Sequence, residues 1–545
     1  MNKRTAIILI AIVLLAALLR LIRIEEVPPG VNRDEASIGF TALSLLTTGR
    51  DEYGRHLPIS FESFGDWKLP LYIYTAVPFV ATLGPTELAI RLPSAAAGIA
   101  TVALTFFLIL ELLGSAPLGL LAAFALAVSP WHLHLSRVES ESNIAVLFVT
   151  TALLLFFKSL KKNARAWFLP ASAVLFALTY FTYHGNHVTT TLLLTGLVFI
   201  YRKSIPKGTP RIIAIILFLL LTAFILAKTF GQADRTKIAG ISIFGDPAVI
   251  HEKIELPRNL SPDPSSLFVR LRYNRATYAV QALTTNYLKS FSPEFLFFKG
   301  GGNHAHNIEG IGNFYLIEGL FLILGVAALI AKRKERYAQF LLWWLAIAPA
   351  AASITKDAPH SNRMFAIFPL PAILVALGAV SIFAFLRTKG TSALRAGIII
   401  LCTLYVMSIA NYLYLYHVQF PKNETHHWGY AYKRLAPYLT GPYADKKVIM
   451  SHPERSPYIF LLLYMNYDPA TYQTEALRYP PTDDAFVHVA GFNRFSFREI
   501  DWKKDLTNDS VIVDFYQNVP PQYRPLIRET IIAPNGTPAL AIISL

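Results

Sequence analysis

The chain has 545 residues, of which 54% are hydrophobic and 16% are charged, and its mean hydropathy is +0.42. Soluble proteins average about 45–50% apolar and about 25% charged residues, so a single water-soluble core is excluded. The net charge is +15, but residues 417–545 hold 13 basic and 13 acidic residues. The excess therefore lies in the apolar part, and no nucleic acid is expected as a partner. The single cysteine, Cys402, excludes an intrachain disulfide.

Eleven apolar segments are predicted to cross a membrane, because about 20 mainly apolar residues span about 30 Å of hydrocarbon. Two segments, 69–84 and 115–130, are short for a crossing, and exchanging them keeps the same number of spans. We prefer 115–130, because Pro70 and Pro78 suit an interfacial helix better. The predicted spans are 5–24, 86–112, 115–130, 141–160, 166–183, 187–202, 210–230, 313–331, 336–354, 362–386 and 393–416.

Basic residues cluster in the short connections between these spans, for example at 158–165, 202–211 and 332–336. Short cytoplasmic loops of membrane proteins carry such an excess of Lys and Arg. We therefore expect an integral protein of the cytoplasmic membrane, with the N-terminus inside and the C-terminus outside.

Three outward segments are long: 25–85, 231–312 and 417–545. The middle segment is rich in Pro, Asn and Gly, which predicts a mobile loop with a glycine hinge. The last segment predicts a small extracytoplasmic α/β domain, following an all-α membrane domain over residues 1–416. Its expected elements are strands at 447–450, 485–489, 511–515 and 539–545 and a helix at 457–467.

Two adjacent carboxylates, Asp34 and Glu35, follow the first span. Asp34 is equally compatible with a helix N-cap, whose side chain accepts hydrogen bonds from free backbone N–H groups. The functional alternative is a carboxylate at the membrane face that takes a proton from a nucleophile. Glu35 is the weaker candidate for that role.

A second acidic site, with Glu141 at its centre, opens the span at 141–160 on the same predicted side. There the helix dipole favours negative charge, which is a purely structural explanation. Lys68, His360 and Arg363 supply positive charge near the same face. Such charges suit a lipid phosphate, although anchoring at the membrane interface explains them equally well.

Six short motifs resemble the bacterial polyprenyl-phosphate-dependent, protein-mannosyltransferase-like glycosyltransferases (glycosyltransferase family 39, GT-C fold), which include the lipid A aminoarabinose transferases. Their order and spacing carry the resemblance, which covers about residues 1–416. The motifs are Arg-Asp-Glu-Ala (33–36), Thr-Gly-Arg-Asp-Glu-Tyr-Gly-Arg-His-Leu-Pro (48–58), Lys-Leu-Pro-Leu-Tyr (68–72), Arg-Leu-Pro-Ser (91–94), Ser-Pro-Trp-His (129–132) and Ser-Arg (136–137).

The resemblance implies a GT-C membrane domain of about 11 helices that receives a lipid-linked sugar from the side. It implies that Asp34 is the catalytic Asp, that Lys68 binds the carrier phosphate and that Glu141 is the second acidic residue. Further candidates for donor binding are His360, Arg363, Arg137 and Tyr183. Where the aminoarabinose transferases have two prolines after the lysine, this chain has Leu69 and then Pro70, which argues against a lipid A acceptor.

The predicted function is inverting transfer of a sugar from a polyprenyl-phosphate carrier to a lipid, glycan or protein acceptor on the outer face of the membrane. A divalent metal ion held by Asp34 and Glu141 is a further possibility, since hard cations prefer carboxylates. Three alternatives remain open: an oligosaccharyltransferase-like enzyme, a lipid or sugar transporter, and a membrane scaffold. A transporter should show ionisable residues at mid-span and inverted repeats, whereas the predicted spans have mostly uncharged centres and no duplication is visible.

Overall fold

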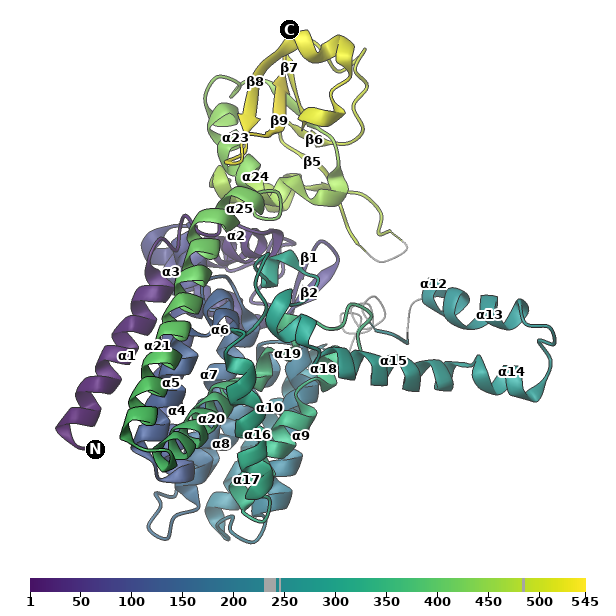
Figure 1. Ribbon diagram of the computed structural model, residues 1–545. Coiled ribbons are helices and arrows are strands. Elements are labelled where there is room, and N and C mark those ends of the chain that lie inside the picture. Colours follow the sequence, from purple (N-terminus) through teal and green to yellow (C-terminus); the bar gives the residue numbers. More distant parts are fainter. Residues whose placement is uncertain (230–241, 245–246, 483–485) are drawn as a thin grey trace. The chain divides into compact units, whose positions relative to one another are not determined.

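The computed structural model describes residues 1–229, 242–244, 247–482 and 486–545 (Figure 1). The chain divides into two compact units. The first consists of Met1–Ile22 and Ser94–Tyr412, and the second of Arg23–Pro93 and Leu413–Leu545. The predicted domain boundary after residue 416 lies close to the change of unit at 412/413. The first outward segment, 25–85, belongs with the C-terminal part.

The first unit is helical, and each predicted span contains a helix. Among the described residues, six helices are long and apolar enough to cross a membrane: α1, α4, α7, α10, α20 and the helix that begins with α21. The total of eleven crossings stays a prediction. The helices are α1 (Lys3–Leu21), α4 (Glu87–Leu113), α5 (Ala116–Val128), α7 (Glu141–Ser159), α8 (Phe168–Leu178), α9 (Gly185–Tyr201), α10 (Thr209–Thr229), α16 (Glu318–Ala331), α17 (Arg336–Ile347), α20 (Leu370–Thr388) and α21 (Thr391–Tyr414).

The sequence alone did not decide which of the two short segments, 69–84 or 115–130, crosses the membrane, and both are helices. The helix α5 packs against α1 and α20, which are both long enough to span a membrane. By contrast, α3 (Pro70–Leu83) packs against α2 (Arg33–Thr48) of the second unit. This packing favours α5 as the crossing and α3 as an interfacial helix.

The prediction of a mobile loop with a glycine hinge over 231–312 did not foresee helices, but most of the described part is helical. Residues 231–241 and 245–246 lie outside the described residues. The rest is largely helical, and Ser266 and Asn274 are the N-caps of two of its helices. The elements are α12 (Pro247–Ile250), a π-helix (His251–Glu255), α13 (Leu256–Asn259), α14 (Leu267–Arg272), α15 (Arg275–Lys289) and a second π-helix (Glu294–Phe298).

The second unit contains a sheet whose described strands follow the order β4-β5-β6-β3-β7-β9-β8. The central strand β3 is parallel to β6 and β7, and the other neighbours are antiparallel. Helices α23 (Tyr430–Thr440), α24 (Pro457–Tyr464) and α25 (Pro469–Glu475) complete this part. The strands are β3 (Lys447–Met450), β4 (Leu477–Arg478), β5 (Val489–Phe492), β6 (Phe495–Phe497), β7 (Ser510–Phe515), β8 (Ile527–Ile532) and β9 (Pro538–Ile543).

The predicted strands at 447–450, 511–515 and 539–545 and the helix at 457–467 are confirmed to within a few residues. The strand predicted at 485–489 begins only at Val489, and Ala485 lies outside the described residues. The predicted α/β character of this region is therefore correct.

One hydrophobic core joins the first outward segment to this sheet. Phe40 of α2 and Phe64 are buried together with Val448 of β3 and Val511 of β7. The rings of Phe40 and Tyr472 meet edge to face at 5.6 Å. The segment that carries Asp34 and Lys68 is thus built into the same unit as the C-terminal domain.

Candidate functional site

Asp34 and Lys68 form an ion pair in the second unit. The Lys68 Nζ lies 3.1 Å from the Asp34 Oδ1. The lysine side chain is only 6% exposed, whereas that of Asp34 is 53% exposed. The carboxylate therefore stays open to a reactant, while the ammonium is held within the protein.

A short β-hairpin places Lys68 beside α2. The strands β1 (Phe61–Ser63) and β2 (Asp66–Lys68) pair antiparallel, and Phe61 lies opposite Lys68. The two loop residues, Phe64 and Gly65, both have positive φ, as a type I′ hairpin turn requires. Phe64 is buried, and the Lys68 Nζ lies 5.2 Å from the centre of its ring. The turn and the ring together fix the lysine.

The N-terminus of α2 tests the alternative explanation for Asp34, in which this residue is the N-cap of the helix. The N-cap is Asn32, whose side-chain oxygen accepts a hydrogen bond from the Glu35 N–H at 2.8 Å. Glu35 in turn accepts one from the Asn32 N–H, which completes a capping box. Asp34 is not the N-cap, so its position beside Lys68 is left without that structural explanation.

Glu35 has a structural role in this fold. Its carboxylate is fully buried and receives two hydrogen bonds of 2.9 Å from Arg91, one from Nε and one from Nη2. Arg91 also donates to the carbonyls of Ile24, Pro28 and Gly30. Glu35 therefore neutralises a buried arginine that ties the start of α4 to the chain before α2.

Glu52 is a site residue that sequence reasoning missed. Its side chain is 1% exposed, and its Oε1 accepts a hydrogen bond from the Tyr458 hydroxyl at 3.2 Å. Burial raises the pKa of Glu52 to about 7, against the opposing charges of Arg478 and Lys68. The signal in the sequence is the 48–58 motif, whose two acidic residues lie among three basic ones.

A second polar cluster lies in the first unit, around residues 359–363, which have the sequence Pro-His-Ser-Asn-Arg. Arg363 forms an ion pair with Asp357, and its Nη1 donates a hydrogen bond to Thr355 Oγ1 at 2.8 Å. Arg363 and Tyr183 are also hydrogen-bonded. Tyr183 also interacts electrostatically with Glu141. These effects bring three predicted site residues together: Arg363, Tyr183 and Glu141.

His360 belongs to the same cluster as a structural residue. It is buried, it caps α19 (Ser361–Met364), and its Nδ1 accepts a hydrogen bond from the Arg363 N–H at 3.3 Å. Burial and the neighbouring Arg363 lower the pKa of His360 to about 3. A neutral His360 brings no positive charge to a phosphate, so it acts by holding Arg363 in place.

The helix that begins with Glu141 is tied to this cluster by its first residues. The hydroxyl groups of Ser140 and Ser142 both donate to the Asn362 side chain, the first at 3.5 Å. The start of α7, where Glu141 lies, is thus tied to the segment that carries Arg363.

Arg137 is buried away from solvent at the end of α1. Its Nη1 donates to the Leu19 carbonyl at 2.7 Å and its Nη2 to the Ile22 carbonyl at 2.8 Å. Free carbonyls at a helix end attract such a cation. The structure therefore gives Arg137 a capping role, and its binding to the donor stays a prediction.

A metal ion shared by Asp34 and Glu141 also stays a prediction. The two carboxylates belong to different compact units. Within the second unit, Asp34 faces an ammonium, which would compete with a cation for its oxygen.

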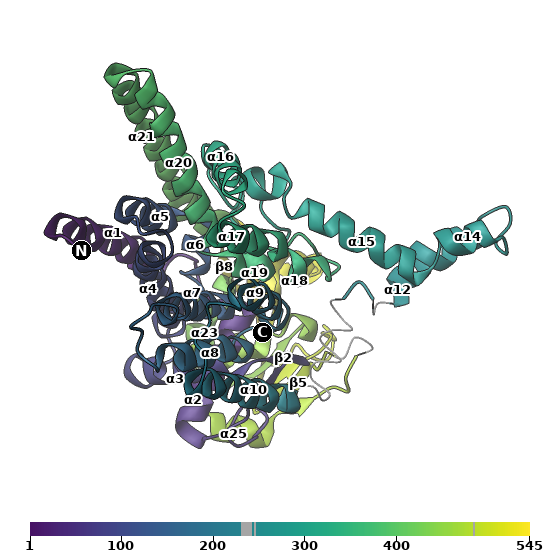
Figure 2. The same cartoon turned by 90° about the horizontal axis from the view of Figure 1, so that it is seen from below.

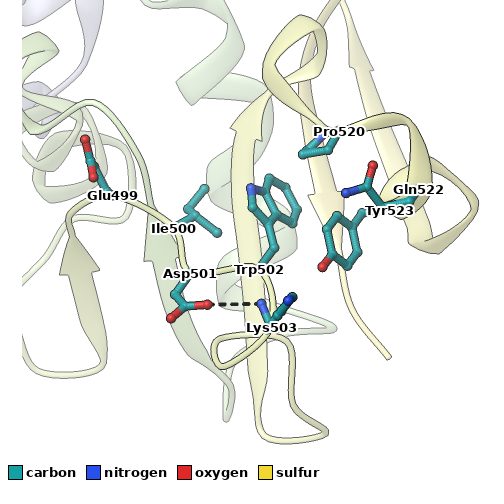
Figure 3. A pocket seen from close by; sticks show the side chains of 8 residues that line it. All are labelled: Glu499, Ile500, Asp501, Trp502, Lys503, Pro520, Gln522 and Tyr523. Atoms are coloured by element: carbon teal, nitrogen blue, oxygen red, sulfur yellow. Dashed lines mark hydrogen bonds between the residues drawn. The ribbon is translucent and has the colours of Figure 1, made fainter.

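A pocket of about 560 Å³ lies on the C-terminal domain, apart from all predicted site residues. Figure 3 shows Trp502 and Tyr523 side by side, and their rings stack at 5.0 Å. The lining residues are Glu499, Ile500, Asp501, Trp502, Lys503, Pro520, Gln522 and Tyr523.

Comparisons with known proteins agree with this fold. Residues 68–228 match the family model described as dolichyl-phosphate-mannose-protein mannosyltransferase. A sequence search of curated proteins finds no match. The crystal structure of ArnT from Cupriavidus metallidurans in the apo state is 12% identical, covers 98% of this chain and 97% of its own, and has a TM-score of 0.55. The same protein bound to undecaprenyl phosphate gives 11% identity, coverage of 99% and 98%, and a TM-score of 0.54.

The archaeal oligosaccharyltransferase AglB from Archaeoglobus fulgidus, in complex with an inhibitory peptide and a dolichol-phosphate, is more distant. It is 12% identical with a TM-score of 0.50, and the match covers 85% of this chain but 64% of AglB. The fold and the family match define the chain as an integral membrane glycosyltransferase of the GT-C type. Over residues 68–228 it is similar to the dolichyl-phosphate-mannose-protein mannosyltransferases, and its fold is similar to that of ArnT over almost the whole chain.

Proposed function

We propose that the protein transfers a sugar from a polyprenyl-phosphate carrier to an acceptor hydroxyl on the extracytoplasmic face, with inversion at the anomeric carbon. The observation that carries this proposal is the Asp34–Lys68 pair. A half-exposed carboxylate 3.1 Å from a buried ammonium provides a proton acceptor next to a phosphate-binding cation.

In the proposed reaction, Asp34 takes the proton of the acceptor hydroxyl while the acceptor oxygen attacks the sugar C1. The bond between C1 and the phosphate oxygen breaks, and its electron pair leaves with the polyprenyl phosphate. Lys68 stabilises the charge that develops on that phosphate. A single displacement of this kind inverts the configuration at C1.

The sequence resemblance assigns Arg363 and Glu141 to the same reaction. Arg363 presents a planar fork of donors that suits a phosphate, and Tyr183 and Asp357 fix its orientation. Glu141 supports this cluster from the start of α7. The basic clusters in the short connections support the proposed orientation, with the C-terminal domain outside.

The test uses purified protein in native-lipid vesicles with radiolabelled polyprenyl-phosphate sugar and membranes as the source of acceptor. Asp34→Asn keeps the size of the side chain but removes its basicity, so transfer should fall by about 10²-fold or more. Glu26→Gln is the matched control, because Glu26 lies in the same segment, is exposed and pairs only with Arg23 among the contacts described for it. An Asp34→Asn variant that transfers sugar at the wild-type rate would refute the assignment.

A further inference from the structure

The helices between α10 and α16 form a hairpin with large apolar side chains exposed at its far end. Leu260 is 76% exposed, Leu267 74%, Phe268 71% and Leu271 61%. Exposed apolar groups are normal when scattered singly, but a contiguous group of them marks an interaction surface. We call residues 256–272, which include α13 and α14, the hairpin tip.

At its other end, the hairpin is fixed to the rest of the first unit. The Asn286 side chain donates hydrogen bonds to the carbonyls of Ser353 at 3.1 Å and Thr355 at 2.9 Å. The Tyr287 hydroxyl donates to the Ala346 carbonyl at 2.8 Å. Ala346 lies at the end of α17, and Ser353 and Thr355 lie at and just after the end of α18 (Ala350–Ser353). The hairpin therefore leaves the bundle at the end of the predicted span 336–354.

Within the first unit, α15 runs across the direction of α16 and α9, and α14 lies at its far end; both views agree (Figures 1 and 2). A helix that leaves a bundle sideways at the end of its spans runs along the plane of the membrane surface. The Arg258 guanidinium donates to the Tyr273 carbonyl at 3.1 Å, which ties α13 to the end of α14. The tip is therefore held as a folded element.

The charge of the hairpin tip indicates the kind of surface that it contacts. The hairpin tip contains three basic residues and one acidic one, namely Arg258, Arg270, Arg272 and Asp263, and Arg275 follows it directly. On α14 the apolar residues Leu267, Phe268 and Leu271 have the spacing of one helix side. Arginines next to such a side extend their charged ends to lipid headgroups while the apolar groups insert.

We propose that the hairpin tip inserts its apolar side chains into the headgroup region of an anionic lipid bilayer. The bilayer is the favoured occupant because the spans keep it next to the hairpin, and basic residues attract its anionic lipids. This attachment is separate from the proposed transferase chemistry. It holds the described helices from α12 to α15 along the membrane surface.

The experiment places one environment-sensitive fluorophore on the tip of the full-length protein. Phe268→Cys in a Cys402→Ser background is labelled with NBD and reconstituted in nanodiscs of phosphatidylcholine with phosphatidylglycerol. The emission should shift to the blue and be quenched by brominated acyl chains. Both effects should weaken in phosphatidylcholine alone and in an Arg270→Gln/Arg272→Gln variant. A label at Gln281, an exposed polar position of α15, should respond to neither.

Two results would overturn the proposal. One is a label at position 268 that stays accessible to aqueous iodide and shows no bromolipid quenching in either lipid mixture. The other is a label shielded from iodide but not quenched by bromolipid, with position 268 cross-linking to a second polypeptide, since the tip would then bind a protein. Neither readout depends on sugar transfer, so failure here is distinct from failure of the proposed function.

Discussion

The adjacent carboxylates Asp34 and Glu35 should respond in opposite ways to the same loss of charge. Glu35→Gln leaves the buried Arg91 without its countercharge, and breaking a buried ion pair costs about 3–5 kcal/mol. Asp34→Asn removes a carboxylate that is 53% exposed and therefore already screened by water, so although Lys68 is buried the loss should be small, about 1 kcal/mol or less. The first variant should therefore lose stability, and the second should lose transfer without losing stability.

The assay is thermal unfolding of both purified variants in the same detergent, together with sugar transfer by the same preparations well below the unfolding temperature. Glu35→Gln should unfold at a clearly lower temperature than the wild type, whereas the unfolding temperature of Asp34→Asn should equal that of the wild type. The reasoning would be refuted by an Asp34→Asn variant that is as unstable as Glu35→Gln. It would equally be refuted by a Glu35→Gln variant that keeps wild-type stability and loses transfer.

Three further predictions concern the charged groups. Lys68→Met should lower kcat by about 10²-fold in donor-saturation kinetics, since it removes a donor to the leaving phosphate; an unchanged kcat would exclude that role. Arg363→Lys keeps the charge but loses the fork, so kcat/KM should fall by about tenfold, the size of one charge-assisted hydrogen bond; full activity of Arg363→Lys would contradict this. Because the fold raises the pKa of Glu52 from 4.5 to about 7, the folded protein binds the neutral carboxyl form more readily than the unfolded chain does. The resulting contribution to stability is complete below pH 4.5 and is lost as pH rises through about 7. Glu52→Gln should therefore gain up to about 3 kcal/mol relative to wild type between pH 5 and pH 8, and parallel unfolding curves of the two proteins across that range would disprove it.

The sequence predicted the membrane helices well because their signal is local. A run of apolar residues identifies a helix such as α10 or α20 without knowledge of its neighbours. The strands β3, β7 and β9 were found for the same reason. By contrast, β8 was missed, because its buried and exposed residues do not alternate and polar residues such as Arg528 and Glu529 are exposed. An edge strand carries such charges as protection against further pairing.

What the sequence could not predict depends on contacts between distant segments. Phe40 and Val511 share a core, and no local pattern shows that the first outward segment belongs with the C-terminal sheet. The different environments of Asp34 and Glu35 are set by Lys68 and Arg91, which lie elsewhere in the chain. The helices of 247–289 were missed because the Pro, Asn and Gly content of the whole segment outweighed the short helical patterns within it, such as that of Leu267, Phe268 and Leu271.

The anomeric configuration of the transferred sugar is the most direct test of a single displacement assisted by Asp34. Donor labelled with carbon-13 at C1 can be supplied to the reconstituted wild-type protein, and the C1–H1 coupling of the product measured by NMR. The proposed mechanism predicts a configuration opposite to that of the donor. A product with the configuration of the donor would contradict it, because retention requires two displacements and a covalent or ion-pair intermediate.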